Sequence, residues 1–281
     1  MDLSIIIASW NVKQHLYDCL QSIYHYTAGI QFEVIVVDNA SSDGSATMVA
    51  EQFPQVRLVC NAVNRGFGAA NNQGIAIATG QHILFLNDDT AITDNIFPTV
   101  MARFKNIADQ SIGLIGCSLR NPDGTIQASV RRFPTVWDQS IILLKLHHFV
   151  PALLNRYIMT TFNYQSEQTV DQVMGAFMLV PKLVLERVGI FDEHFFNWFE
   201  EVDLQRRIQQ AGWQVLYTPV AHCIHVRGAS FKQWRRPQAQ TVFNQSMRYY
   251  FGKHHSKLAQ YYLTSLQPIS MLLSYVAQTF S

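Results

Sequence analysis

The first ninety residues alternate between short apolar runs and stretches in which apolar residues recur at helical spacing. The pattern predicts strands joined by helices in a β-α-β rhythm. The predicted strands are Ser4–Trp10, Phe32–Asp38, Arg57–Asn61 and His82–Asp88, and the predicted helices are Leu16–Tyr26, Ser45–Phe53 and Gly68–Thr79. Because these strands are apolar on both faces, they indicate an α/β fold with a mostly parallel, Rossmann-like sheet flanked by helices.

Polar residues follow each of these predicted strands. Ligands of parallel sheets bind beyond the carboxyl ends of the strands. We therefore expect one crevice at which the strand ends converge, lined by the segments Ser9–Asn11, Asp38–Asn39, Asn61–Arg65 and Asn87–Asp89.

The second half of the chain is less regular. Residues 118–170 are mixed, with a predicted turn at Asn121–Gly124, and are candidates for a lid or an acceptor platform. Order returns with a predicted strand, two helices and a strand, at Val173–Pro181, Lys182–Val188, Glu201–Ala211 and Trp213–Pro219. We expect one domain over 1–232, with a donor-binding half at about 1–117 and an acceptor and catalytic half at about 118–232. A C-terminal helical extension is expected over 233–281.

The composition excludes several classes of protein. The 21 basic and 20 acidic residues give a net charge of +1, so no overall field favours nucleic acid as a partner. The four cysteines have no CxxC spacing, which argues against a zinc knuckle or a disulfide framework. Because the amino terminus lacks the pattern of a secretory signal, the predicted location is the cytoplasm.

Adjacent carboxylates at the end of the fourth predicted strand are candidates for a metal site. Asp88 and Asp89 repel each other unless a cation or solvent relieves them, and Mg²⁺ or Mn²⁺ accepts a few carboxylates together with substrate phosphates. The alternative is an ordinary acidic turn.

Two loops are candidates for nucleotide binding. Asp38 can accept a hydrogen bond from a ribose hydroxyl or a base imide, and Arg65 can reach a nucleotide from its glycine-rich loop. A helix cap and a tight turn are the structural alternatives.

A cluster of acids behind aromatic residues is the candidate for a general base. Glu200, Glu201 and Asp203 begin a predicted helix, where apolar neighbours would raise a carboxyl pKa. Stabilisation of the helix dipole is the alternative. His225, with Arg227 close by, could hold a diphosphate or its metal, although a single histidine could also be structural. Arg131 and Arg132 carry a similar ambiguity, because surface arginines are common.

Taken together, these segments resemble a known family over about Ser4–Lys253, namely the family 2 nucleotide-sugar glycosyltransferases with the GT-A fold, in their rhamnosyltransferase-like branch. The resemblance rests on SIIIASWN, VIVVDNASSDGS, NRGFGAANNQG, LFLNDDT, DGTIQASVRRFPT, the segment from VMGAFMLV to QVLY, and HCIHVRGAS.

The resemblance implies a role for each matching residue. Donor-binding residues would be Ser9, Asn11, Asp38, Asn39, Arg65, Asn87 and Asp88. Asp89 matches the last acid of the DXD motif and would bind the metal with His225, while Asn87 replaces its first acid. Glu201 stands where the family usually has the Asp of an ED pair, so it is the expected base, with Glu200 as the second candidate. Acceptor-side candidates are Gly175, Ala176, Trp198 and Arg131.

The resemblance also implies the reaction. We expect inverting transfer of a sugar from a nucleotide diphosphate donor, with deoxythymidine-diphosphate rhamnose suggested by the branch, to a glycan or lipid-linked glycan acceptor in cell-surface polysaccharide synthesis. The alternative is a catalytically impaired protein of the same fold that binds a nucleotide sugar or a glycan.

The carboxyl-terminal tail is apolar and aromatic from Leu258 to Phe280, and basic residues precede it. It is a candidate for peripheral contact with the inner face of the cell membrane. A helix packed on the domain and a homodimer contact are the alternatives, and Pro268 argues against a spanning segment.

Overall fold

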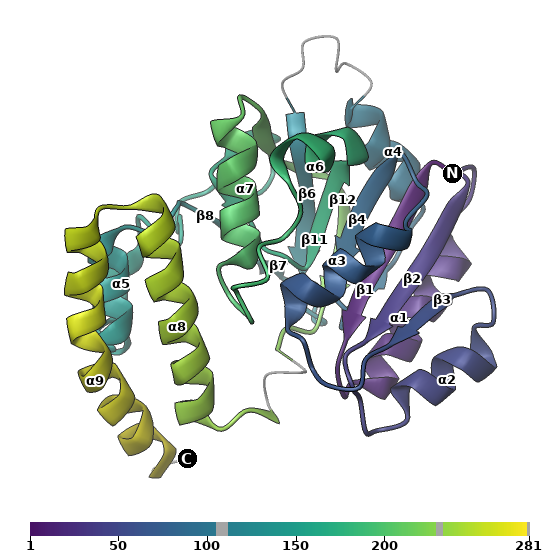
Figure 1. The fold of residues 1–281 in the computed structure, drawn as a ribbon. Coiled ribbons are helices and arrows are strands. Elements are labelled where there is room, and N and C mark those ends of the chain that lie inside the picture. Colours follow the sequence, from purple (N-terminus) through teal and green to yellow (C-terminus); the bar gives the residue numbers. More distant parts are fainter. Residues whose placement is uncertain (105–111, 229–232, 280–281) are drawn as a thin grey trace.

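The computed structural model describes residues 1–104, 112–228 and 233–279 (Figure 1). Within these residues a large sheet runs through the molecule, with helices on both faces and further helices at one side. Its strand order is β3-β2-β1-β4-β11-β6-β12-β5. In addition, β7 pairs with β6, and β9 pairs with β12. The predicted α/β fold is therefore confirmed.

The amino-terminal half has the predicted β-α-β rhythm. Its elements are β1 (Leu3–Ser9), α1 (Lys13–Tyr26), β2 (Phe32–Asp38), α2 (Ser45–Gln52), β3 (Arg57–Cys60), α3 (Phe67–Ile77) and β4 (His82–Leu86). The pairings of β1 with β2, β1 with β4 and β2 with β3 are parallel. The carboxyl ends of β1, β2 and β4 consequently lie at the same edge of the sheet.

Alternate side chains of each central strand pack on opposite faces of this sheet. Ile5 and Ile7 of β1 belong to the core cluster that includes Leu16 of α1. Ile6 lies on the other face, in a cluster with Ala70 of α3. Since both faces are buried, the strands read as continuous apolar runs, which is why the sequence predicted them well.

The middle of the chain contains more regular structure than its sequence pattern indicated. Its elements are β5 (Thr90–Ile92), α4 (Phe97–Met101), β6 (Ile112–Arg120), β7 (Ile126–Gln127), β8 (Val130–Arg131), α5 (Val136–Leu143), the 3₁₀ helices η2 (Leu146–His148) and η3 (Pro151–Leu154), and β9 (Gln168–Val170). Strand β6 lies inside the sheet between β11 and β12. Helix α5 begins with a capping box between Thr135 and Asp138.

The remaining sheet elements differ in part from the prediction. They are β10 (Gln172–Val173), β11 (Phe177–Pro181), α6 (Lys182–Val188), α7 (Glu200–Gln210) and β12 (Gln214–His225). The single strand predicted over Val173–Pro181 is wrong, because residues 174–176 separate two strands of different sheets. Strand β11 is antiparallel to β4 and β6, and β12 continues beyond the predicted end at Pro219 through a register shift.

Two long helices, α8 (Arg236–His254) and α9 (Lys257–Thr279), follow β12 in the chain. They pack against α5 beside the sheet (Figure 1). A separate core joins them to α7, with Phe195 and Phe199 packed against Met247, Tyr250 and Leu263. The predicted C-terminal helices are therefore present. The domain boundary expected at residue 232 falls within 229–232, outside the described residues.

Candidate functional site

Two adjoining cavities lie at the carboxyl edge of the sheet. The smaller has a volume of about 110 Å³ and the larger about 470 Å³. Both are lined by Phe67, Asn87, Asn197 and Gly228. A molecule that fills the small cavity therefore reaches the wall of the large one.

The small cavity collects the polar ends of the parallel strands. Among its lining residues are Ser9 from the end of β1, Asn39 after β2, and Asn87, Asp88 and Asp89 after β4. The convergence expected from the sequence is observed for these five residues and for Trp10 and Asn64, which lie in the predicted segments Ser9–Asn11 and Asn61–Arg65. Lining residues that the sequence did not single out include Phe196, Asn197 and Trp234.

Asp88 and Asp89 are both buried in this wall. Burial, and then the adjacent charge of Asp89, raise the pKa of Asp88 to about 8, while Ser9 and the Trp10 backbone oppose the rise. An added positive charge at this position would therefore favour the ionised pair.

His225 comes to the same wall from the other half of the chain. It is the last residue of β12 and pairs with Thr90 of β5, beside Asp89. The strand predicted to end at Pro219 therefore extends to His225. The Nε2 atom of His225 lies 3.1 Å from Asp89 Oδ1 and 3.3 Å from Asn87 Nδ2.

Gln127, which lies in one of the motifs quoted above but was not predicted to be functional, fixes the orientation of the His225 ring. The amide nitrogen of Gln127 donates to the His225 carbonyl (3.1 Å) and to Asn121 Oδ1 (2.8 Å). Its Oε1 therefore faces His225 Nδ1, at 2.6 Å, and must accept that hydrogen. In the neutral ring, Nε2 then carries its lone pair toward Asp89.

This geometry fits a divalent cation that also binds phosphate. Within the described part of the chain, no three His, Cys, Asp or Glu side chains form a cluster that could hold a metal ion. Mg²⁺ and Mn²⁺ nevertheless bind through one or two protein ligands when phosphates complete the shell. Neighbouring ligands about 2.1 Å from an octahedral ion are about 3 Å apart, and Asp89 Oδ1 and His225 Nε2 are separated by 3.1 Å.

Three predicted donor-binding residues lie outside the described walls of both cavities. Asn11 accepts a hydrogen bond from the Ser42 backbone, and its side chain therefore braces the loop after β2. Arg65 is half-exposed and lies 3.8 Å from Glu193. Asp38 is buried; its Oδ2 accepts from Ser41, and its Oδ1 has no hydrogen-bond partner in the described structure.

Gly66 holds the loop of Arg65 against the segment that precedes α7. Its φ of 86° lies in the left-handed region, and a side chain there would collide with the Phe196 backbone. Phe67 donates its backbone N–H to the Phe196 carbonyl at 3.0 Å. The small cavity is thereby closed between parts of the chain 130 residues apart in sequence.

The large cavity contains the predicted base candidates. Glu200 and Glu201 begin α7 and both line this cavity, together with the acceptor-side candidates Gly175, Ala176, Trp198 and Arg131. Each glutamate has a buried Oε2 without a hydrogen-bond partner among the described residues. Two unpaired acceptors thus face a cavity large enough for a sugar.

The electrostatic environment distinguishes the two glutamates. Burial raises the pKa of Glu200 well above its usual value, and the charge of Glu201 raises it further. Burial also raises the pKa of Glu201. Backbone amides oppose the rise for both carboxyl groups, whereas Arg131 opposes it for Glu201. The Arg131 guanidinium therefore favours ionisation of Glu201.

The backbone ahead of the glutamates is strained. Trp198 and Phe199 have φ values of 64° and 70°, in the left-handed region that bulky residues avoid. Each such residue costs about 1–3 kcal/mol and needs surrounding structure to hold it. Here Phe199 packs against Phe243 and Tyr250 of α8, so the C-terminal helices help to hold the start of α7.

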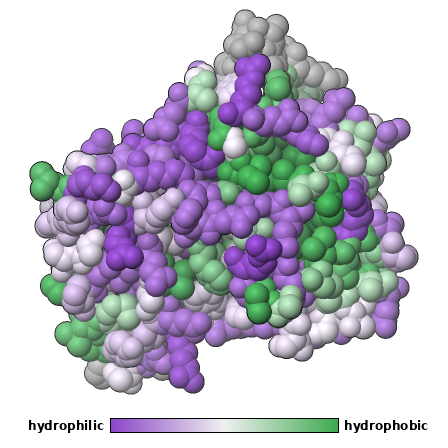
Figure 2. Space-filling model, in the orientation of Figure 1, coloured by the Kyte–Doolittle hydropathy of each residue, from purple (hydrophilic) through white to green (hydrophobic). Residues whose placement is uncertain are grey.

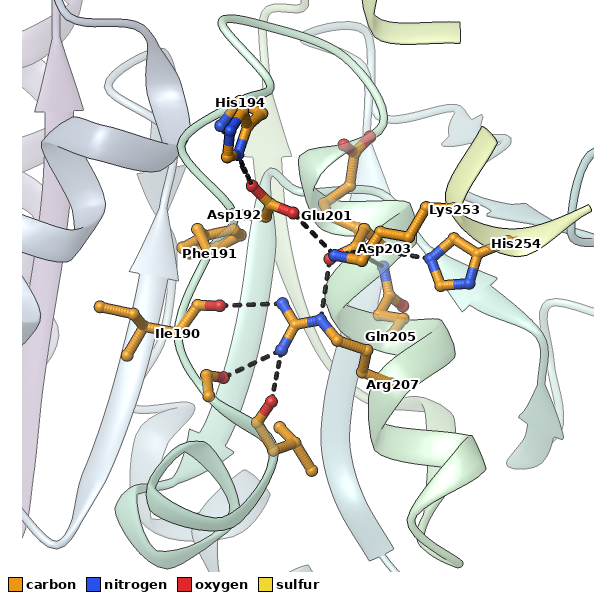
Figure 3. A network of polar contacts seen from close by, with 12 residues as sticks. Ile190, Phe191, Asp192, His194, Glu201, Asp203, Gln205, Arg207, Lys253 and His254 are labelled. Carbon is orange, nitrogen blue, oxygen red and sulfur yellow. Dashed lines mark hydrogen bonds and ion pairs between the residues drawn. The ribbon is translucent and has the colours of Figure 1, made fainter. Parts of the chain in front are cut away.

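Asp203, which the sequence grouped with the two glutamates, does not belong to the cavity wall. It is fully buried in the first turn of α7, where it contacts Arg207 at 2.8 Å, Lys253 at 2.8 Å and His254 at 2.6 Å (Figure 3). Lys253 also reaches Asp192 at 2.7 Å. The network ties α7 to α8 and to the loop after α6.

Two polar residues of the large cavity were missed by the sequence analysis. Gln139 Oε1 and Ser129 Oγ are buried, and neither has a hydrogen-bond partner in the described structure. Gln139 lies between Asp138 and Ser140 in α5, so nothing in the sequence distinguished it from its polar neighbours. Such groups suit the hydroxyls of a sugar.

Comparison with known proteins gives the following similarities. A family model described as "Glycosyltransferase like family 2" matches residues 2–244. The chain is 28% identical over 242 residues to an N-acetylglucosaminyl-diphospho-decaprenol L-rhamnosyltransferase of Mycobacterium tuberculosis, covering 81% of this chain and 77% of the relative. It is also 28% identical over 204 residues to the rhamnosyltransferase WbbL of Escherichia coli, covering 69% and 72%.

A solved structure supports the fold. The mannosyltransferase PcManGT of Pyrobaculum calidifontis, in complex with GDP-Man and Mn²⁺, is similar with a TM-score of 0.58 and 19% identity. The alignment covers 98% of this chain and 73% of that protein. The GT-A type of fold expected from the sequence is thereby confirmed.

Proposed function

Since this chain belongs to the family 2 glycosyltransferases, we propose that it is an inverting, metal-dependent enzyme that transfers a sugar from a nucleotide diphosphate. The family and the similar rhamnosyltransferases support a glycosyltransferase that acts in polysaccharide or lipid-linked glycan synthesis. The donor, the stereochemistry and the metal are our proposals. Rhamnose is the proposed sugar because two of the similar proteins are rhamnosyltransferases.

The donor binds at the polar strand ends in this proposal. Asn39 and Asn87 line the small cavity on the path toward the diphosphate. Asp38 lies outside the described cavity wall, next to Asn39, and its unpaired Oδ1 would accept from the base or ribose. Asp89 and His225 hold Mg²⁺ or Mn²⁺, which, when bound, offsets the negative charge of the leaving diphosphate. Arg65 and Asn11 act at the margin, through the loops that they support.

The acceptor hydroxyl binds in the large cavity, beside Glu201. Gly175 lies close to Glu201, since a methyl group added to it would sit 3.6 Å from Glu201 Cγ. Ala176 connects the two cavities, because its carbonyl accepts a hydrogen bond from Asn87 N at 3.1 Å. Gln139, Ser129 and Trp198 supply polar and aromatic contacts for a sugar ring.

Glu201 is the general base in this mechanism, and Glu200 stays protonated beside it. Glu201 takes the acceptor proton while the acceptor oxygen forms a bond to the anomeric carbon. The bond from that carbon to the diphosphate oxygen breaks, and the nucleoside diphosphate leaves with the electron pair. A single displacement of this kind inverts the anomeric configuration.

The observation that carries the proposal is the shared wall of the two cavities, with Asn87 between the carboxylates of the small cavity and the glutamates of the large one. The test is release of nucleoside diphosphate from a panel of nucleotide sugars, with and without Mn²⁺, in the presence of a lipid-linked glycan. We expect release from deoxythymidine-diphosphate rhamnose, and proton NMR of the product should show an inverted linkage. Tight donor binding without any release would instead favour the catalytically impaired protein.

A further inference from the structure

Helix α9 has an unusual distribution of side chains. Its exposed face carries seven large apolar or aromatic residues, of which Leu258 is 80% and Leu272 64% exposed; the seven are Leu258, Tyr261, Tyr262, Ile269, Leu272, Tyr275 and Val276. At 3.6 residues per turn these positions span an arc of about 140° on one side of the helix. In Figure 2, hydrophobic residues accordingly lie at the left margin, where Figure 1 places α9.

The opposite face of α9 packs on the protein with both apolar and polar residues. Leu263, Ser270 and Ser274 are buried there, and the partly buried Leu266 packs against the same core. Ser270 Oγ has no hydrogen-bond partner in the described structure. A helix that only completed the protein core would keep its large apolar side chains inward, so the seven exposed apolar and aromatic residues of α9 indicate an apolar environment outside.

The charge of this part of the chain is of one sign. All 20 acidic residues lie in residues 1–203, whereas residues 204–281 contain nine Lys and Arg residues and no acid. Arg248 on α8 and Lys257 lie near the start of α9 and are exposed. The guanidinium of Arg236 donates a hydrogen bond to the carbonyl of Ala277, near the end of α9. Basic residues therefore flank both ends of the apolar face.

We propose that the apolar face of α9 docks on the surface of an anionic lipid bilayer. The apolar side chains would enter the boundary between head groups and acyl chains, and the flanking basic residues would contact anionic head groups. A second copy of this chain is a poorer occupant, because a symmetric contact between two α9 helices would bring like charges together. Among the described helices, none is long and apolar enough to cross a membrane, so the contact is along the surface.

The docked orientation also places the large cavity near the lipid. Ala239 and Phe243 of α8 line that cavity, and α8 packs along α9. A glycan attached to a lipid could then enter from the bilayer side. The docking surface itself does not depend on the transfer reaction, and binding to lipid can be measured without any donor or acceptor.

The test is co-sedimentation of the full chain with vesicles of phosphatidylglycerol and phosphatidylcholine, compared with vesicles of phosphatidylcholine alone. We expect binding to the anionic vesicles that weakens in high salt. The double variant Leu258→Glu/Leu272→Glu should lower vesicle affinity about 10-fold or more, because both side chains are exposed and their change leaves the core intact. Leu183→Glu, at an exposed leucine of α6, is the matched control and should bind as the wild type does.

Three outcomes would overturn the proposal. One is absence of wild-type binding to anionic vesicles. Another is equal binding by the double variant and the α6 control. The third is a wild-type protein that is a dimer in analytical ultracentrifugation and does not bind vesicles, together with a double variant that is a monomer. That result would assign the apolar face to a second copy of the chain. Circular dichroism and donor binding of each variant verify that the fold is intact.

Discussion

Arg131 and Glu201 line the same cavity, and the guanidinium acts on the carboxyl group through its charge. Burial disfavours the ionised form of Glu201, whereas a general base must be ionised to accept a proton. Arg131 partly offsets that effect of burial. In the proposed mechanism, Arg131 would therefore keep Glu201 ionised at a lower pH than burial alone would allow.

Replacing Arg131 with Gln should shift the pH profile of transfer. Loss of the positive charge raises the pKa of Glu201. On acidification, the transfer activity of the variant should therefore fall at a higher pH than that of the wild type. Measurement of kcat from pH 4 to 8 checks this shift. Arg132→Gln, at the exposed neighbouring position, is the control, and an unchanged acid limb in Arg131→Gln would contradict the role.

Gln127 acts on His225 through its amide oxygen. Gln127→Met keeps the size of the side chain but removes the acceptor for Nδ1–H. The ring should then lose its fixed tautomer, and Mn²⁺ affinity in the presence of nucleoside diphosphate should fall about 10–100-fold. Nitrogen-15 NMR of His225 and a Mn²⁺ titration by electron paramagnetic resonance measure the two effects. An unaltered tautomer and affinity would show that Gln127 has only a packing role.

At the scale of elements, helix α7 is held from two sides. Its first turn carries the two glutamates and Asp203, and Asp203 is bound by groups from α7 itself and α8 (Figure 3). Burial opposes ionisation of Asp203, but His254, Lys253 and Arg207 outweigh it and hold its pKa below the usual value. Because the folded-state pKa is lowered, this stabilisation is present above about pH 4 and is lost as the pH falls through the folded-state value.

Asp203→Asn should lower the free energy of unfolding by about 1–3 kcal/mol at neutral pH, since charge-assisted hydrogen bonds become neutral ones. The loss should shrink as the pH falls from about 4 through the lowered folded-state pKa, where the wild-type carboxylate is protonated as well. Urea unfolding at several pH values measures both trends. The same change at exposed Asp18 of α1 should have little effect, and equal losses in the two variants would argue against the network.

Comparison of individual elements explains what the sequence could predict. Strands β1, β2 and β4 were found because burial on both faces makes their residues apolar without interruption. Strand β12 was predicted too short, since Pro219 usually ends a strand, whereas here the shift of register between Thr218 and His222 accommodates it. Its true end at His225 is fixed by pairing with β5, which is a contact between distant segments.

The sequence likewise predicted some residues of the candidate site and not others. Motif positions such as Asp89 and Glu201 were identified from the sequence, and the structure places them in the walls of adjoining cavities. Gln127 and Gln139 could not be singled out by spacing, because their importance arises from which atoms they face in the folded chain. The placement of Asn11 and Arg65 at the margin likewise depends on loop geometry.

At the scale of the whole molecule, the two cavities meet because segments far apart in sequence are joined across the sheet. The small cavity is built mainly by the ends of β1, β2 and β4, and the large one by the start of α7 together with α5 and α8. Asn87 belongs to both. The central claim is that the donor occupies the first cavity while Glu201 deprotonates an acceptor in the second.

A single-turnover transfer assay on Glu201→Gln, with donor affinity measured on the same sample, tests this claim most directly. Donor binding should be unchanged, and transfer should fall about 10²–10⁴-fold, as expected for loss of a general base. Glu186→Gln, at an exposed position on α6, should transfer at the wild-type rate. Wild-type transfer by Glu201→Gln would contradict the account.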